Sequence, residues 1–255
     1  MTEPRVLVER DGPVTTITLN RPEIMNALSA QLVDDLTAGV RAAETDGTRV
    51  VVLRGAGRAF CSGADLGSGS ADIGLIDACN TFVTTVTASD LPVVSVIHGP
   101  AVGMGVSIAL AADLPIASTA GYFSLAFTRI GLMPDGGASA LVAAGIGRAA
   151  VQRMALLGER VSGERAAELG LIAAVTQPDE LEAEVARVVS ALAAGAPGAL
   201  ARTKNAVNAA TLGGLPAALD REKAGQTALL DEPDFAEGVA AFQQKRPPEF
   251  GQRQQ

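Results

Sequence analysis

The chain has 255 residues, of which 48% are hydrophobic and 28 are glycine, and its formal net charge is −8. This composition is typical of a globular α/β protein, and the scattered basic residues argue against a nucleic-acid-binding surface. Two cysteines are too few for a disulfide framework and lack metal-ligand spacing. Because residues 1–12 lack the pattern of a secretory signal, we expect a cytoplasmic protein.

The first half of the chain alternates short β-branched runs with helical patterns. We expect strands at residues 5–10, 14–20, 49–53, 92–97 and 114–117 and helices at 72–89 and 104–112. A further helix follows the first two strands, with an apolar stripe of Leu32, Leu36, Val40 and Ala43. Ser29 is expected to cap the first helix. The run 49–53 is expected to be a buried parallel strand, and the repeated order predicts stacked β-β-α units. Glycines, His98 and Asp113 interrupt the apolar stretch 91–118, which indicates a buried core segment and not a membrane span.

The second half reads as helices separated by Pro or Gly. The expected helices cover residues 136–157, 163–169, 178–194, 197–211, 216–229 and 235–244. We therefore predict a mixed α/β core over residues 1–195 and a C-terminal helical region over residues 196–255.

Two glycine-rich segments follow strand-like runs and point to chemistry on an acyl group. They are GRAFCSGADL at 57–66 and HGPAVGMGVSIALAAD at 98–113. Small residues let backbone N–H groups approach a ligand closely, and two such groups at one oxygen would form an oxyanion hole.

Other readings of these segments carry less support. The run 55–60 imitates a dinucleotide-binding glycine pattern, but its third glycine is replaced by Phe60. Ser107 and the single histidine, His98, could form a hydrolase pair, yet a satisfied helical serine and a structural histidine fit the pattern better. Asp65 is expected to brace the first turn, and Asp113 to act as a cap or as a buried partner.

Asp135 is the remaining candidate for acid–base chemistry. It lies in IGLMPDGGAS, at an expected loop-to-helix junction, where it could simply be an N-cap. The alternative is a general base, because neighbouring Leu132 and Met133 offer an apolar setting that raises a carboxyl pKa.

At this point the chain resembles the enoyl-CoA hydratase/isomerase, or crotonase, superfamily. The match runs through TITLNRPEIMNALS, AFCSGADL, HGPAVGMGVSIALAADLPIAS, FSLAFTRIGLMPDGGAS and the tail FQQKRPPEF. The resemblance implies a spiral of β-β-α units closed by C-terminal trimerisation helices, assembled as a homotrimer or a hexamer. It also implies a coenzyme A thioester as substrate, with no permanently bound cofactor or metal, and an oxyanion hole formed by the N–H groups of Ala64 and Met104.

The same resemblance implies a groove for the coenzyme A portion of the substrate. Backbone groups of Ser62, Asp65 and Leu66 would follow the adenine and pantetheine, next to Ala64. Met25 and Ala27 would line the groove, and Lys245 would meet a phosphate, from this subunit or a neighbour.

The departures from the family pattern predict the reaction. Ser107 and Phe127 stand where hydratases of the family carry the two glutamates that activate water. Asp135 stands where members that move a double bond carry an aspartate. We therefore expect isomerisation with Asp135 as general acid and base. The alternatives are a non-catalytic acyl-CoA-binding protein, and a hydratase using another carboxylate such as Asp72.

Overall fold

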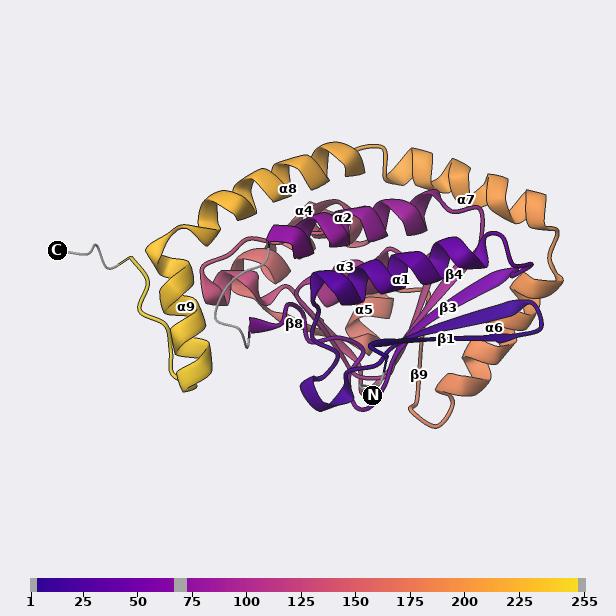
Figure 1. Cartoon of the computed structure of the whole chain (residues 1–255), viewed down its shortest axis with the longest axis horizontal. Helices are drawn as coiled ribbons and strands as arrows, with labels where there is room; N and C mark the ends of the chain where they lie inside the picture. The colour runs from indigo at the N-terminus through magenta and orange to yellow at the C-terminus, as the bar shows by residue number, and fades with distance from the viewer. Residues whose placement is uncertain (1–3, 67–72, 252–255) are drawn as a thin grey trace.

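The computed structural model describes residues 4–66 and 73–251 and contains two sheets (Figure 1). The larger has the strand order β1-β2-β3-β4-β6-β9 and the smaller the order β5-β7-β8. Strands of the larger sheet are β1 (Val6–Asp11), β2 (Val14–Leu19), β3 (Val50–Gly55), β4 (Val93–Ile97), β6 (Leu114–Ser118) and β9 (Ala174–Thr176). β1 and β2 form the expected antiparallel hairpin, and the pairs from β2 onward are parallel. The predicted α/β class is thus confirmed, as is the parallel strand expected at residues 49–53, which is β3.

Helices cover both faces of the larger sheet. The sequence of β3 provides apolar side chains that pack on each of these faces. Val51 and Leu53 belong to the main hydrophobic core, which also contains apolar residues of α1 (Ala30–Ala43), α2 (Ile73–Ala88) and α3 (Met104–Leu110). Val50 and Val52 alternate with them and pack in a second cluster with α6 (Leu181–Ala194). Because successive strand residues face opposite sides, a continuous run of valines supplies both layers.

The smaller sheet was not expected from the sequence. It consists of β5 (Pro100–Val102), β7 (Tyr122–Ser124) and β8 (Arg160–Ser162). These strands have three residues each, which is too short for an alternating hydrophobic pattern to be recognised. The sheet matters for the site because β5 leads directly into the second glycine turn.

The C-terminal helices form an arm across the helical face of the protein. α7 (Pro197–Thr211) and α8 (Leu215–Leu230) arch over α1 and α2 in Figure 1, and α9 (Pro233–Gln244) turns away at the end of the arm. The chain bends by 111° between α6 and α7, at the predicted boundary between residues 1–195 and 196–255. The division into these two regions remains a prediction.

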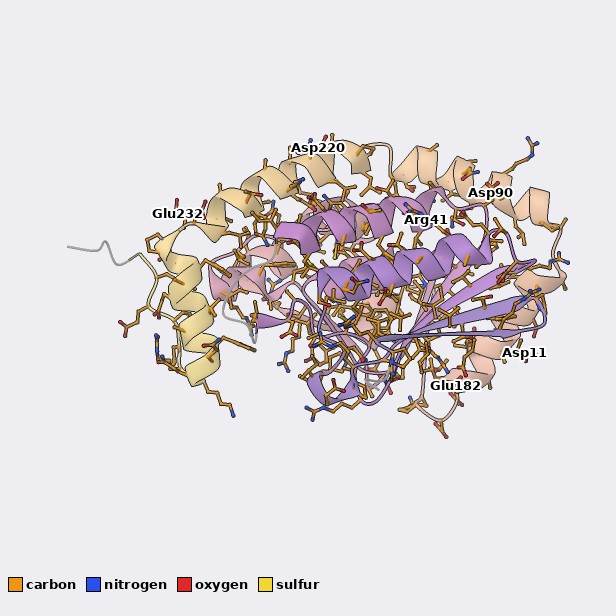
Figure 2. The ribbon with its side chains drawn as sticks, in the orientation of Figure 1. Asp11, Arg41, Asp90, Glu182, Asp220 and Glu232 are labelled. Carbon is orange, nitrogen blue, oxygen red and sulfur yellow. The ribbon has the colours of Figure 1, made fainter. Side chains whose placement is uncertain are left out.

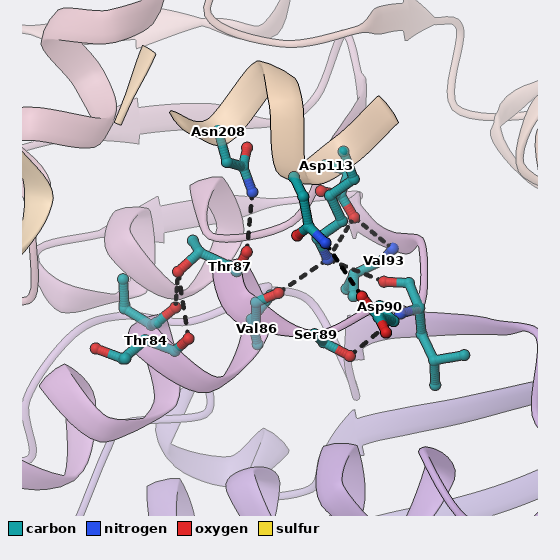
Figure 3. Close-up of polar contacts among 12 residues, drawn as sticks. Thr84, Val86, Thr87, Ser89, Asp90, Val93, Asp113 and Asn208 are labelled. Atoms are coloured by element: carbon teal, nitrogen blue, oxygen red, sulfur yellow. Dashed lines mark hydrogen bonds and ion pairs between the residues drawn. The ribbon is translucent and has the colours of Figure 1, made fainter. Parts of the chain in front are cut away.

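Buried polar contacts attach α7 to the core (Figure 3). The Lys204 ammonium donates to the carbonyls of Val86 and Leu91, at 2.9 Å each, and lies 3.0 Å from an Asp113 carboxylate oxygen. Asn208 donates to the Thr87 carbonyl one turn further along α7. Asp113 is therefore a partly buried partner of the Lys204 ammonium and not a helix cap, which agrees with one of the two roles expected for it.

α4 (Ala138–Leu157) lies between β7 and β8 of the smaller sheet, and α5 (Gly163–Leu169) leads from β8 to β9 of the larger sheet. α4 is long and apolar enough to cross a membrane. In the part of the chain that is described, it is the single helix of 18 or more residues for which this holds. Its backbone leaves helical geometry at Gly147, at φ 74° and ψ 169°, so two shorter helices meet there. Its first turns bury Ala138, Leu141 and Val142 in the protein core. The apolar stretch 91–118 lies in β4, β5, α3 and β6, as expected for a core segment.

Candidate active site

A cavity of about 1000 Å³ lies between the two glycine turns, the start of α2, the loop before α4, α8 and α9. Its wall is mostly apolar. The residues that the sequence assigned to catalysis or to the acyl-CoA groove border it, Lys245 excepted, together with Phe127: Met25, Ala27, Ser62, Ala64, Asp65, Leu66, Met104 and Asp135. The structure therefore brings together residues that are more than one hundred positions apart in the chain.

The two glycine turns lie against each other. A Cβ atom at Gly63 would be 3.0 Å from the Val102 carbonyl oxygen and 3.7 Å from the Gly103 Cα. Both glycines have positive φ, 93° and 57°, a conformation that side chains disfavour. Hydrogen bonds between Cys61 and its neighbours Pro100 and Val102 hold the turns in register, at 3.0 and 2.9 Å. The peptides that carry the Ala64 and Met104 N–H groups are thus adjacent.

These two N–H groups are available for a ligand. Within residues 4–66 and 73–251, no acceptor is paired with the N–H of Ala64 or of Met104. Met104 is the first residue of α3, where a helix leaves its N–H groups without internal partners. Gly105 lets α3 lie close to Cys61 in the first glycine turn, because a Cβ at position 105 would be 2.8 Å from the Cys61 carbonyl oxygen. The geometry is compatible with the oxyanion hole implied by the resemblance.

Asp135 lies on the loop between η3 (Ala126–Ile130) and α4, fully buried at the cavity wall. Its Oδ2 accepts a hydrogen bond of 2.8 Å from the Gln226 amide, while Oδ1 has no partner among the described residues. Burial raises the pKa of Asp135 well above its ordinary value, the Gln226 hydrogen bond lowers it, and the charge of Glu222 raises it further. The carboxyl is therefore a stronger base than an exposed aspartate.

The interpretation of Asp135 as an N-cap is wrong. α4 begins at Ala138, its N-cap is Gly137, and no side chain of that loop accepts from the first turn. The Glu222 carboxylate on α8 does so, accepting from the N–H groups of Gly137 and Ser139 at 2.6 and 2.8 Å. The free N–H groups at the start of α4 are thus hydrogen-bonded by a side chain of α8. The Asp135 carboxyl takes no part in capping and borders the cavity.

The structure also bears out the preferred interpretations of Ser107 and His98. The Ser107 hydroxyl is buried within α3 and donates to the Asp135 backbone carbonyl at 2.9 Å. The His98 ring contacts the Gly57 carbonyl at 2.9 Å. A hydrolase-type pair of these two residues is not formed.

Around the groove, Asp65 has the predicted bracing role. Its carboxylate pairs with Arg21 at 3.0 Å, and its N–H donates to the Leu28 carbonyl. Lys245 is the C-cap of α9 and is not among the residues that border the cavity, although Phe242 and Gln243 of the same helix are. Its contact with a phosphate stays a prediction. Asp72 lies outside the described residues.

Gln226 and Glu222 were not identified from the sequence. They occupy the same face of α8 as the buried Leu215, Ala218 and Leu219, at helical spacing. Polar residues in a buried stripe are the signal that could have identified them, since buried polar side chains need partners. No group of three or more potential metal ligands occurs in residues 4–66 and 73–251.

Comparison with known proteins places the chain in one family. The family model described as enoyl-CoA hydratase/isomerase matches residues 9–253. A "Probable enoyl-CoA hydratase" of Rhodobacter capsulatus is 40% identical over 93% of this chain and 94% of its own length. The "1,2-epoxyphenylacetyl-CoA isomerase" of Escherichia coli is 34% identical over 96% of this chain and 97% of its own length.

Solved structures agree with the sequence relatives. The crystal structure of an enoyl-CoA hydratase from Mycobacterium avium subsp. paratuberculosis has a TM-score of 0.92 and 46% identity, covering 98% of this chain and 99% of that one. A similar structure, an enoyl-CoA hydratase/isomerase from Pseudoalteromonas atlantica, has a TM-score of 0.88 and 29% identity, covering 97% of this chain and all of that one. The fold, the order of the motifs and the relatives agree, and the chain belongs to the enoyl-CoA hydratase/isomerase family.

Proposed function

We propose that this family member isomerises the double bond of an enoyl-CoA thioester, with Asp135 as its single acid–base group. The observation that carries the proposal is the Asp135 carboxyl: fully buried, bordering the cavity, with one oxygen held by Gln226 and the other without a partner in the described chain. The E. coli relative named as an isomerase supports it, as does the "Trans-2-decenoyl-[acyl-carrier-protein] isomerase" of Streptococcus mutans, which is 31% identical.

The reaction needs one proton carrier and one site for negative charge. Asp135 removes a proton from C2 of a 3-enoyl thioester, and the electrons of the C–H bond pass into a dienolate. The N–H groups of Ala64 and Met104 stabilise the charge on the thioester oxygen. Asp135 then returns the same proton to C4, which leaves the 2-enoyl product and restores the carboxylate. Its raised pKa suits both steps near neutral pH.

Hydration has less support from the residues present. The addition of water needs a base for the water and an acid for the α-carbon, which the resemblance assigns to the positions of Ser107 and Phe127. The Ser107 hydroxyl is engaged with the Asp135 carbonyl. Phe127 borders the cavity and carries no ionisable group.

The substrate proposed is an acyl group with a mainly apolar body on coenzyme A. Leu75, Ile76, Phe127 and Leu132 supply apolar wall to the cavity that Asp135 borders. Backbone groups of Ser62, Asp65 and Leu66 would follow the coenzyme A portion, with Met25 and Ala27 beside it and Lys245 at a phosphate.

Assembly into a homotrimer or hexamer is also a proposal. Leu156 and Leu157 at the end of α4 are 65% and 59% exposed, and Phe242 on α9 is 62% exposed. Leu156 and Leu157 are neighbours on α4, and contiguous exposed apolar side chains are typical of surfaces that another chain covers. Sedimentation equilibrium would test the expected state.

A panel of 2-enoyl and 3-enoyl CoA thioesters, assayed for isomerisation, hydration and binding, tests the function. The Asp135→Asn variant is expected to bind the thioester and lose double-bond migration. Asp220→Asn is the matched control, because Asp220 is exposed on α8. Wild-type turnover in Asp135→Asn would contradict the proposal. Binding without any turnover in the wild type would favour the acyl-CoA-binding alternative, and hydration would favour another carboxylate.

A further inference from the structure

Helix α8 presents two buried polar side chains, one turn apart, to the loop that carries Asp135. Glu222 is 1% exposed and Gln226 3% exposed. Asp220, labelled in Figure 2, lies on the outer side of the same helix. Burying a carboxylate and an amide is costly unless both are hydrogen-bonded, so their contacts define what this face of α8 does.

The Gln226 amide bridges the two sides of Pro134. Its Oε1 accepts from the Met133 backbone N–H at 3.1 Å, and its Nε2 donates to Asp135 Oδ2 at 2.8 Å. The first contact fixes the orientation of the amide, because a backbone N–H needs an oxygen as its acceptor. The Nε2 group is thereby directed at the carboxylate. Gly225 makes room for this arrangement, since a Cβ there would overlap the Met133 sulfur.

Glu222 fixes the other end of the same loop. It accepts from Gly137 and Ser139, which closes the N-terminus of α4. The loop is thus held by α8 on both sides of Asp135. Among the described residues, the ionisable groups that face Asp135 are Glu222 from α8 and the buried Cys79 thiol from α2.

We propose that Gln226 is a positioning residue for Asp135: by holding Oδ2 it leaves Oδ1 as the one oxygen that takes the proton from the acyl group and returns it. The inference rests on the proposed isomerase function and deepens it. Both proton transfers then occur on one face of the dienolate, at a carboxylate that cannot rotate to present its other oxygen. Held geometry of this kind matters, because a displacement of about 1 Å at a reacting group costs about 100-fold in rate.

The test replaces Gln226 by Met, which has similar length but cannot donate. We expect kcat for isomerisation to fall about 10- to 100-fold with KM changed less than about threefold. The pH–rate profile is the second readout. The Gln226 hydrogen bond lowers the pKa of Asp135, so its loss raises that pKa and moves the acid limb of kcat to higher pH.

Two further variants separate positioning from a structural effect. Gln31→Met makes the same chemical change at an exposed residue of α1 and is expected to keep the wild-type profile. Gln226→Glu can still accept from Met133 and, when protonated, donate to Asp135. It is therefore expected to recover activity toward acidic pH, where Gln226→Met does not.

The outcomes distinguish this inference from the proposed function. If Asp135→Asn is inactive while Gln226→Met keeps the wild-type kcat and pH profile, Gln226 does not position Asp135. If Gln226→Met is poorly folded, a Gln226→Glu variant without recovery at acidic pH overturns the inference in the same way. Wild-type turnover in Asp135→Asn refutes the isomerase proposal itself.

Discussion

Replacing Lys204 by Met should destabilise the protein by removing the buried cation that attaches α7, and through it α8, to the core. The Lys204 side chain is 5% exposed, and its ammonium contacts three acceptors: the Val86 and Leu91 carbonyls and the Asp113 carboxylate (Figure 3). Breaking a buried pair costs about 3–5 kcal/mol, because the remaining charge is left without a partner. Asp113 is 20% exposed and water can reach it in part, so we expect about 3 kcal/mol.

The pH dependence provides a sharper test than the magnitude. Burial raises the pKa of Asp113, and the charge of Lys204 partly opposes that rise. Without Lys204 the folded-state pKa of Asp113 rises further, and a raised carboxyl pKa means that stability is lost as the pH increases through it. The deficit of Lys204→Met should therefore be largest near pH 8 and shrink as the pH falls toward about 4, the ordinary pKa of Asp.

Urea unfolding followed by circular dichroism is the assay, because the chain has no Trp and one Tyr. The control is Lys223→Met, which breaks the exposed pair with Asp77 and should cost less than about 1 kcal/mol. Lys204→Met with Asp113→Asn should recover part of the loss. A Lys204→Met deficit below about 0.5 kcal/mol, or one that does not change with pH, would refute the reasoning.

Three further predictions concern the site. Asp135→Asn should be more stable than the wild type near pH 8, by about 1–3 kcal/mol, because burial of the ionised carboxyl lowers stability as the pH rises; equal urea midpoints at pH 8 would contradict this. Gly105→Ala should lower kcat about 100-fold, since the new Cβ forces α3 away from Cys61 and separates the two N–H donors; unchanged kcat would show that the hole does not depend on this approach. Asp65→Asn should cost less than about 1 kcal/mol, because its pair with Arg21 is partly exposed, and a loss above about 2 kcal/mol would indicate a larger role.

Local sequence signals predicted the helices, the longer strands and the glycine turns around the site. Ser29 caps α1 as expected, accepting from the Leu32 N–H. The valine run predicted β3, and the small residues predicted the two glycine turns. Both signals lie in residues that are close together in the sequence. Strands such as β7 and β9 have three residues, and their pairing depends on partners far along the chain.

The environment of Asp135 could not be predicted from its neighbours. An aspartate before two glycines fits an N-cap equally well, and Glu222 takes the capping contacts only because α8 folds back over the loop. Gln226 reaches Asp135 across 91 positions. Such contacts belong to tertiary packing, which a local pattern does not encode.

The central claim is that Asp135 carries the proton in double-bond migration. The most direct measurement is the rate of conversion of a 3-enoyl CoA thioester to its 2-enoyl isomer by the wild type and by Asp135→Asn, with thioester affinity measured on both. We predict a loss of about 100- to 10,000-fold in rate with affinity retained. Equal rates in the two proteins would contradict the account.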